Sequence, residues 1–223
     1  KNTKKLLRSD IEITNELTIQ PESTMRRDKL FAILGIRYLF LTKKDAGLIQ
    51  YRNRVIWENP TWSIVENKNV LPRAYIVENT EVHQGQNILN RLFDEAFNEK
   101  TTAIIEEAVT LKNHGKSTFV ASVKIKKMQA TNILLSTLTN SDGFLILTDN
   151  FYPGWKAFVD NVEVKIYRTN YTLRGIVVPA GSHTIRFSYE PLSFKLGVYV
   201  SSVFLLIYFL LLFWPKIRSQ KNH

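Results

Sequence analysis

Apolar and polar residues alternate along several short segments in the second half of the chain. Val162, Val164 and Ile166 are separated by polar or charged residues, as are Ile185 and Phe187. Alternation with a period of two is typical of a strand with one buried face. With the other short apolar runs, it predicts about eight strands joined by turns. They are expected near residues 102–109, 117–127, 131–138, 143–149, 155–159, 162–168, 171–178 and 183–189.

The first hundred residues have a mixed pattern. Residues 24–34 and 86–98 carry apolar side chains at helical spacing, which predicts two amphipathic helices. Short apolar runs at residues 36–41, 62–65 and 74–77 predict strands. We therefore expect residues 1–100 to form a small α/β region and residues 101–193 to form an antiparallel β-sandwich.

Turn residues separate the last predicted strands. Asp160 and Asn161 stand between two alternating segments, and both residue types tolerate a positive φ, so they predict a two-residue hairpin turn. The next turn is expected at Pro179–Gly181, and Pro191 is expected to end the sheet. The fold class is thus α+β and mainly β, with a sandwich or jelly-roll-like domain.

The segment from Leu196 to Trp214 contains no charged residue. A helix of this length spans nearly all of a hydrocarbon layer about 30 Å thick. Aromatic residues lie near both of its ends, where amphipathic rings prefer the headgroup level. The sequence predicts a transmembrane helix over residues 194–215, followed by a basic tail over residues 216–223.

The charges on either side of this helix predict its orientation. Lys216, Arg218 and Lys221 follow it without an acidic residue, whereas Glu190 offsets Lys195 on the other side. The positive-inside rule then puts the tail in the cytoplasm and residues 1–193 outside it. The first residues are not a signal peptide, because they lead into no apolar core. We expect the chain to be the C-terminal part of a longer polypeptide that has further membrane segments.

The amino-acid composition excludes several kinds of functional site. The chain has no cysteine, which excludes disulfides, zinc–thiolate sites and cysteine nucleophiles. Its net charge of +10 comes from scattered basic residues without a nucleic-acid-binding motif, so an anionic membrane or cell-wall polymer is the expected partner. No metal site is expected, because no histidine belongs to a metal-spaced pair, and no cofactor is expected, because the sequence has no phosphate loop or dinucleotide fingerprint. The four histidines are His83, His114, His183 and His223.

Several spaced motifs near the C-terminus carry a family resemblance. They are Phe151–Asp160, Tyr167–Asn170, Arg174–Gly175, Val178–His183 and Tyr189–Pro191, in this order ahead of the apolar helix. This pattern resembles the C-terminal end of the bacterial YfhO-like membrane proteins. Two earlier segments, Leu34–Tyr38 and Leu71–Ala74, look like upstream landmarks of the same family.

The resemblance implies an activity for the parent protein. The YfhO-like family is similar to multi-spanning glycosyltransferases that take a sugar from a polyprenyl-phosphate carrier on the outer face of the membrane. In such enzymes the catalytic acid or base usually lies in an early loop of the multi-helix core. This chain lacks that core, so no catalytic residue is assigned to it. The family often has Asp-Gly at the hairpin turn where this chain has Asp160-Asn161.

One group of aromatic and polar residues is a candidate contact surface for a glycan, a phosphopolymer or a lipid headgroup. Aromatic rings can stack on sugars, and arginine can bind a phosphate through two hydrogen bonds. The alternative is structural: the aromatic rings fill the edge of the sandwich and the polar groups satisfy turn carbonyls. The candidate residues are Tyr152, Trp155, Arg168, Asn170, Tyr171 and Arg174.

Two functions of different class remain open. In the first, the chain is the non-catalytic accessory domain and last transmembrane helix of a glycosyltransferase that decorates a cell-surface polymer or lipid. Its partners are then the bilayer of a bacterial cell, the upstream membrane core of the same polypeptide, and a surface glycan or polyprenyl-linked sugar. In the second, it is a membrane-anchored carbohydrate-binding or structural β-sandwich without transferase activity.

Overall fold

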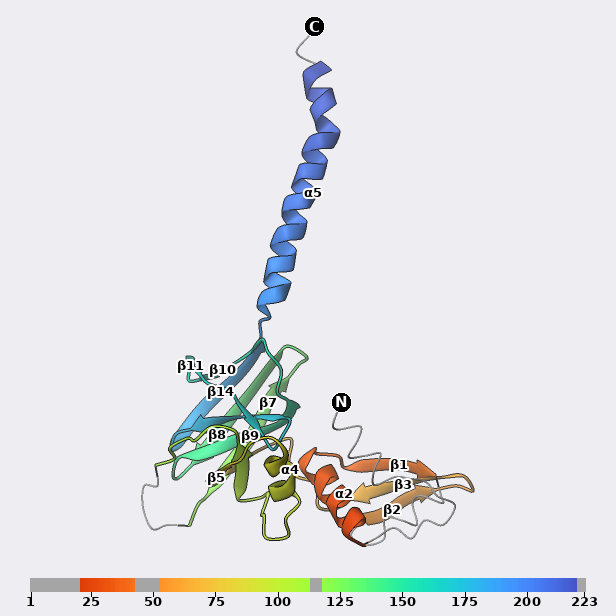
Figure 1. The fold of residues 1–223 in the computed structure, drawn as a ribbon, viewed down its shortest axis with the longest axis vertical. Coiled ribbons are helices and arrows are strands. Elements are labelled where there is room, and N and C mark those ends of the chain that lie inside the picture. Colours follow the sequence, from red (N-terminus) through yellow and green to blue (C-terminus); the bar gives the residue numbers. More distant parts are fainter. Residues whose placement is uncertain (1–20, 43–52, 113–117, 220–223) are drawn as a thin grey trace.

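The structure is a computed structural model that describes residues 21–42, 53–112 and 118–219. It is mainly β, with two large sheets packed face to face, a small third sheet beside them, and one long helix that leaves the sandwich at its C-terminal end (Figure 1). The predicted fold class is therefore confirmed. Four of the predicted strands are observed within one residue of their expected bounds: β4 (Ala74–Val77), β8 (Asn132–Thr139), β9 (Gly143–Asn150) and β10 (Trp155–Val159).

The first large sheet has five antiparallel strands in the order β11-β10-β14-β8-β7. One face of this sheet is buried, and its alternating sequence puts Ile133 and Leu135 of β8 on that face. Strand β7 forms one edge and β11 the other. The remaining strands are β7 (Ala121–Met128), β11 (Val162–Val164) and β14 (Gly181–Tyr189).

The second large sheet has six strands in the order β4-β9-β13-β12-β6-β5. Both of its faces are covered, which explains why β9 is a continuous apolar run from Phe144 to Leu147 rather than an alternating one. Helix α4 (Gln86–Leu92) joins the only described parallel pair, β5 and β6. The remaining strands are β4 (Ala74–Val77), β5 (Asn79–Val82), β6 (Thr102–Ile105), β12 (Tyr167–Thr169) and β13 (Leu173–Val178).

Two apolar cores lie on the two faces of the six-stranded sheet. The sandwich core, between the large sheets, contains Leu145 and Ile176 from one side and Ala157 and Phe187 from the other. The outer core covers the opposite face and includes Ile88 and Leu92 of α4. Strands β4 and β5 precede residue 101 yet complete this sheet, so the sandwich begins before the expected boundary of the small α/β region.

The N-terminal elements form a separate sheet next to the outer core. Helix α2 (Pro21–Ile33) is followed by β1 (Tyr38–Thr42), β2 (Asn53–Glu58) and β3 (Trp62–Asn67), with β3 in the centre. Ile33 at the end of α2 packs into the outer core. The sequence pattern missed β2 and β5, because neither has a regular apolar alternation and each is held by a neighbouring strand.

Two further predictions differ from the structure. The helix expected over residues 86–98 ends at Leu92, and the buried Phe97 reaches the outer core from the turn that follows. The strand expected over residues 162–168 is divided between β11 in one sheet and β12 in the other, so this segment crosses between the sheets. Residue 117, the first of one predicted strand, lies outside the described residues, as do His114 and residues 220–223.

The long helix α5 (Leu192–Ser219) follows Pro191 directly. Its first twenty residues, Leu192–Leu211, have a mean hydropathy of 2.0, and none of them is buried against the rest of the protein. Length and composition suit a membrane span, as the sequence predicts. Figure 1 shows this helix projecting away from the end of the sandwich where β14 finishes.

Candidate functional site

The candidate site lies at the end of the sandwich next to α5. The β9–β10 loop, residues 151–154, is tied to the residues that lead into the helix, because the amide of Glu190 donates to the carbonyl of Gly154 at 2.7 Å. Gly154 has a φ of 100°, and a Cβ at this position would lie 3.1 Å from Pro191. Glycine is therefore needed here both for its backbone conformation and for its small size.

At the centre of the site, Arg174 from β13 meets Trp155 from β10 across the two sheets. The guanidinium carbon lies 3.8 Å from the centroid of the indole ring, which is a close cation–π contact. Arg174 is only 2% exposed, and this burial lowers the pKa of its guanidinium, against the opposing influence of Asp149. The guanidinium is thus a fixed support beneath the indole ring, not a group on the surface.

Asp149 balances the charge of this buried arginine. Its Oδ2 accepts a hydrogen bond of 2.7 Å from Nη2 of Arg174, and its Oδ1 pairs with Arg73. Arg73 directly precedes β4, which pairs with β9, so sheet order brings residues far apart in sequence together. The β9–β13 ladder shifts register between Leu173 and Arg174, close to this cluster. Register shifts of this kind redirect side chains at the ends of strands.

Three aromatic rings form the accessible part of the site. The ring centroids of Trp155 and Tyr189 are 5.3 Å apart, and those of Tyr152 and Tyr189 are 6.4 Å apart. Tyr152 is 61% exposed, whereas Trp155 and Tyr189 are half-buried. We call these three residues the aromatic cluster. Its geometry offers ring faces and edges to a ligand that approaches from solvent.

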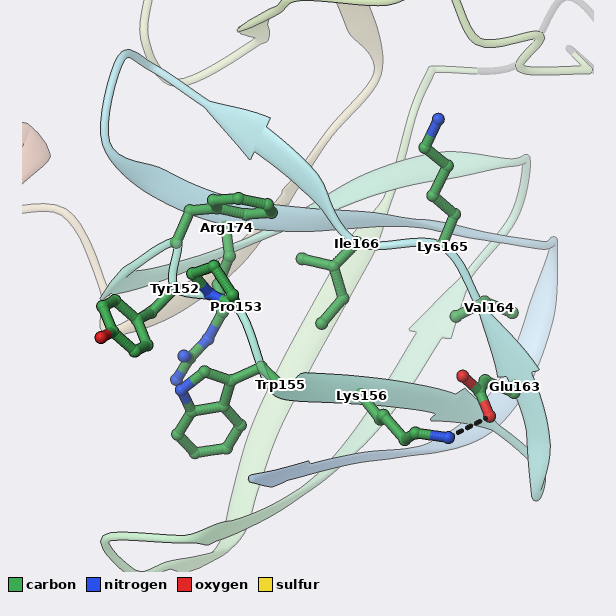
Figure 2. Close-up of a pocket in the computed structure, with 10 residues that line it drawn as sticks. Tyr152, Pro153, Trp155, Lys156, Glu163, Val164, Lys165, Ile166 and Arg174 are labelled. Carbon is green, nitrogen blue, oxygen red and sulfur yellow. Dashed lines mark hydrogen bonds and ion pairs between the residues drawn. The ribbon is translucent and has the colours of Figure 1, made fainter. Parts of the chain in front are cut away.

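A shallow groove of about 210 Å³ lies on one side of Trp155 (Figure 2). This volume is below the roughly 300–1,000 Å³ of pockets that enclose a drug-sized ligand, so it suits a single ring or headgroup. Its other wall is charged, and Lys156 donates to Glu163 there at 3.0 Å. A second groove of about 360 Å³ lies between Trp155, Tyr152, Tyr189 and Ala130.

The structure brings together three of the six predicted contact residues. Tyr152, Trp155 and Arg174 meet as described, whereas Arg168 lies over the ring of Phe151 at 5.3 Å and pairs with Glu106. Phe151 lines the first groove, so Arg168 reaches the site only through that ring.

The other two predicted contact residues belong to the turn between β12 and β13. Asn170 is buried, and its Oδ1 accepts a hydrogen bond of 2.9 Å from the amide of Ile104 in β6. Tyr171 packs against the outer core and has a φ of 77°, which is unusual for a bulky residue. The structural alternative expected Asn170 to satisfy turn carbonyls, whereas its Oδ1 accepts from a backbone amide of a neighbouring strand.

Sequence reasoning did not assign Arg73, Asp149 or Tyr189 to this site. Arg73 stands in the Leu71–Ala74 landmark, which was the available signal, but nothing in a linear pattern pairs it with Asp149. Asp149 is engaged by two arginines, one at each carboxylate oxygen. Within the described residues, no group of three or more histidine and acidic side chains is placed to hold a metal ion.

Comparison with known proteins identifies a family. The family profile of the bacterial membrane protein YfhO matches residues 89–201, which is just over half of the chain. The match runs from α4 into α5 and includes the whole aromatic cluster, Asp149 and Arg174. No curated protein and no solved structure matches the chain.

Proposed function

The chain belongs to the family of the bacterial membrane protein YfhO, and from this premise we propose that it is the accessory domain and last transmembrane helix of a membrane glycosyltransferase. In this proposal the sandwich lies on the outer side of a bacterial cell membrane and the tail after α5 in the cytoplasm. The parent enzyme transfers a sugar from a polyprenyl-phosphate carrier to a cell-surface polymer or lipid. This chain contributes acceptor or carrier contacts and no catalytic group.

One observation carries the proposal: a partly exposed aromatic cluster stands directly beside the start of the membrane helix. The cluster includes Tyr189, and α5 begins at Leu192, so any glycan or sugar-lipid at the cluster lies at the membrane surface. A lipid-linked donor must present its sugar at that level. The rigid support under Trp155, made by Arg174 and Asp149, keeps the indole ring in one orientation for such a ligand.

Tyr152 is the best residue for testing this role. Because it is exposed, its replacement by alanine should leave the sandwich intact, whereas Arg174→Ala removes one partner of a buried ion pair and destabilises the domain by about 3 kcal/mol. We expect Tyr152→Ala, in the full-length protein in its own cells, to raise the KM for acceptor or donor roughly fivefold. This corresponds to a stacking contact of about 1 kcal/mol.

The measurement is transfer of labelled sugar from the polyprenyl-phosphate carrier into the surface polymer, normalised to protein level. Tyr38→Ala is the matched control, because Tyr38 is similarly exposed on β1 of the separate small sheet. Equal transfer by both variants and the unmodified protein would show that the aromatic cluster takes no part in the reaction. A loss that tracks the amount of folded protein would assign the cluster a structural role.

A second candidate function has an observation of its own. Asp149 is held by two arginines and the groove beside Trp155 has an aromatic and a charged wall, which suits a carbohydrate-binding module without transferase activity. Glycan binding that depends on Tyr152, in cells whose sugar transfer does not change when the gene is deleted, would favour this candidate.

A further inference from the structure

We propose that the end of the sandwich next to α5 rests on an anionic phospholipid surface, with Tyr152 and Met128 at the headgroup level and Lys126 and Lys127 of β7 facing lipid phosphates. This interaction goes beyond the proposed function, because it requires neither a glycan nor a transferase. It is a second attachment of the domain to the bilayer, in addition to the transmembrane helix.

Two loops are held at the level of the membrane entrance. The amide of Tyr189 donates to the carbonyl of Thr131 at 2.9 Å, and the amide of Glu190 donates to the carbonyl of Gly154 at 2.7 Å. The apolar part of α5 begins at Leu192, three residues after Tyr189. Since an extended residue spans at most about 3.5 Å, both loops lie within roughly 10 Å of the hydrocarbon boundary, at or next to the headgroup layer.

The exposed side chains at this end suit that layer. Tyr152, in the loop after β9, is 61% exposed, and Met128 at the end of β7 is exposed as well. Tyrosine has an apolar ring and a polar hydroxyl, which is why it is enriched at membrane interfaces. In water the apolar parts of both side chains stay exposed, which is unfavourable in free energy. At the headgroup level those apolar parts are removed from water.

The charge of the same end suits an anionic surface. Lys126 and Lys127 are exposed on the edge strand β7, and no ion pair joins them to an acidic side chain among the described residues. Strand pairing places Lys127 opposite Leu134, which in turn pairs with Arg186, three residues before Tyr189. A lysine side chain at this level reaches within about one Debye length of the lipid phosphates.

A simpler explanation for these lysines is protection of the sheet edge. Lysines and a register shift on an edge strand discourage pairing with another chain, and β7 has both. Lys124 separates the two explanations. It is exposed on the same strand but pairs with Ser136, which is level with Thr184, about 17 Å along β14 from Tyr189. If the lysines only protect the sheet edge, substituting Lys124 or Lys127 should have the same effect. If they contact lipid, substituting Lys127 should have the larger effect.

The absence of cysteine from the chain makes the test direct. The full chain carrying Tyr152→Cys is spin-labelled and reconstituted in phosphatidylcholine vesicles with and without phosphatidylglycerol. Collision of the label with a water-soluble nickel chelate is then measured. Ser182→Cys, at the opposite end of β14, is the matched control site. We expect the label at position 152 to become protected from the chelate on anionic vesicles, while the label at position 182 stays accessible.

Charge substitutions complete the test. In the Tyr152→Cys background, Lys127→Gln should lower the ratio of docked to undocked domain roughly fivefold on anionic vesicles, and Lys124→Gln should leave it nearly unchanged. Equal accessibility at positions 152 and 182, or protection that does not depend on phosphatidylglycerol, would overturn the proposal. Because no sugar transfer is measured, failure here leaves the glycosyltransferase proposal to its own experiment.

Discussion

At the scale of single residues, burial separates side chains that support the site from those that can touch a ligand. Arg174 has the charge that would suit a phosphate, yet it is buried beneath Trp155 and neutralised by Asp149. Tyr152 has no charge and its ring centroid lies 6.4 Å from that of Tyr189, but it is exposed and lines both grooves. Substitution of Tyr152 is therefore expected to have the larger effect on ligand binding, and substitution of Arg174 the larger effect on stability.

His183 forms a charged pair at the opposite end of the sandwich. Its Nδ1 is 2.6 Å from Oδ2 of Asp160, and its Nε2 is 3.2 Å from the carbonyl of Ala180. Both partners are acceptors, so both ring nitrogens donate, which only the protonated imidazole can do. The hydrogen bond with Asp160 raises the pKa of His183 above its ordinary value.

This pair predicts a pH dependence of stability. Because the folded-state pKa of His183 is raised, its contribution is fully present below the unfolded value of about 6.5 and is lost as the pH rises through the higher folded value. The difference in melting temperature between the unmodified chain and His183→Gln in detergent should shrink above about pH 6.5. In an Asp160→Asn background, substituting His183 should no longer produce a pH-dependent difference. A difference that stays constant with pH would contradict the charged pair.

At the scale of the elements, the six-stranded sheet is constrained because both of its faces are packed. Strand β9 lies between β4 and β13, and its residues Phe144 to Leu147 have no exposed surface. Gly175 of β13 faces the ring of Phe144, and a Cβ added there would lie 2.3 Å from a ring carbon and 2.8 Å from the carbonyl oxygen of Leu145. The close packing of these two strands depends on the missing side chain.

We therefore expect Gly175→Ala to destabilise the domain by about 1–3 kcal/mol, because the added methyl group overpacks the sheet. Thermal unfolding of the chain in detergent should show a lower melting temperature, by several degrees for a domain of this size. Gly197→Ala on α5 is the matched control, since nothing lies within 4 Å of its Cβ position. Equal melting temperatures for both variants would show that β9 and β13 can separate without cost.

The turn between β10 and β11 is another feature at the scale of the elements. Asp160 and Asn161 have φ values of 48° and 71°, which confirms the predicted two-residue turn. The primed turn type needs a positive φ at both positions, which asparagine accepts more readily than most residues. Three further residues have a positive φ: Gly154 in the loop at the candidate site, and Asn170 and Tyr171 in the turn between β12 and β13.

At the scale of the whole molecule, the chain is a β-sandwich with an apolar helix attached to the end that carries the aromatic cluster. The domain and the helix are joined through Glu190 and Pro191, and Glu190 is hydrogen-bonded to Gly154 and to Lys195 on either side of the junction. The domain is therefore connected to the membrane without a long linker, which favours a fixed height above the lipid.

The proposed orientation can be tested with single cysteines. A membrane-impermeant maleimide should label Ser182→Cys in intact cells and should label Ser219→Cys only after the membrane is opened, because the positive-inside rule puts the basic tail in the cytoplasm. The unmodified chain is the blank, since it contains no cysteine. Labelling of position 219 but not of position 182 in intact cells would reverse the orientation.

Sequence alone determined the features that depend on local chemistry. The apolar helix follows from a long segment without charge, the strands follow from short apolar runs, and the turn at Asp160-Asn161 follows from two residues that accept a positive φ. The family resemblance was also present in the sequence, in the motifs of residues 151–191, which lie within the family match to residues 89–201. Each of these signals is carried by neighbouring residues.

Only the tertiary structure decided which side chains meet. Arg73, Asp149 and Arg174 come from three different strands or their ends, and the order β4-β9-β13 brings them together. Asn170 and Tyr171, in the turn after β12, lie instead at β6 and the outer core, away from the aromatic cluster. Sheet order and burial are set by packing across the whole domain, because the free energy of burying a face depends on every strand that covers it.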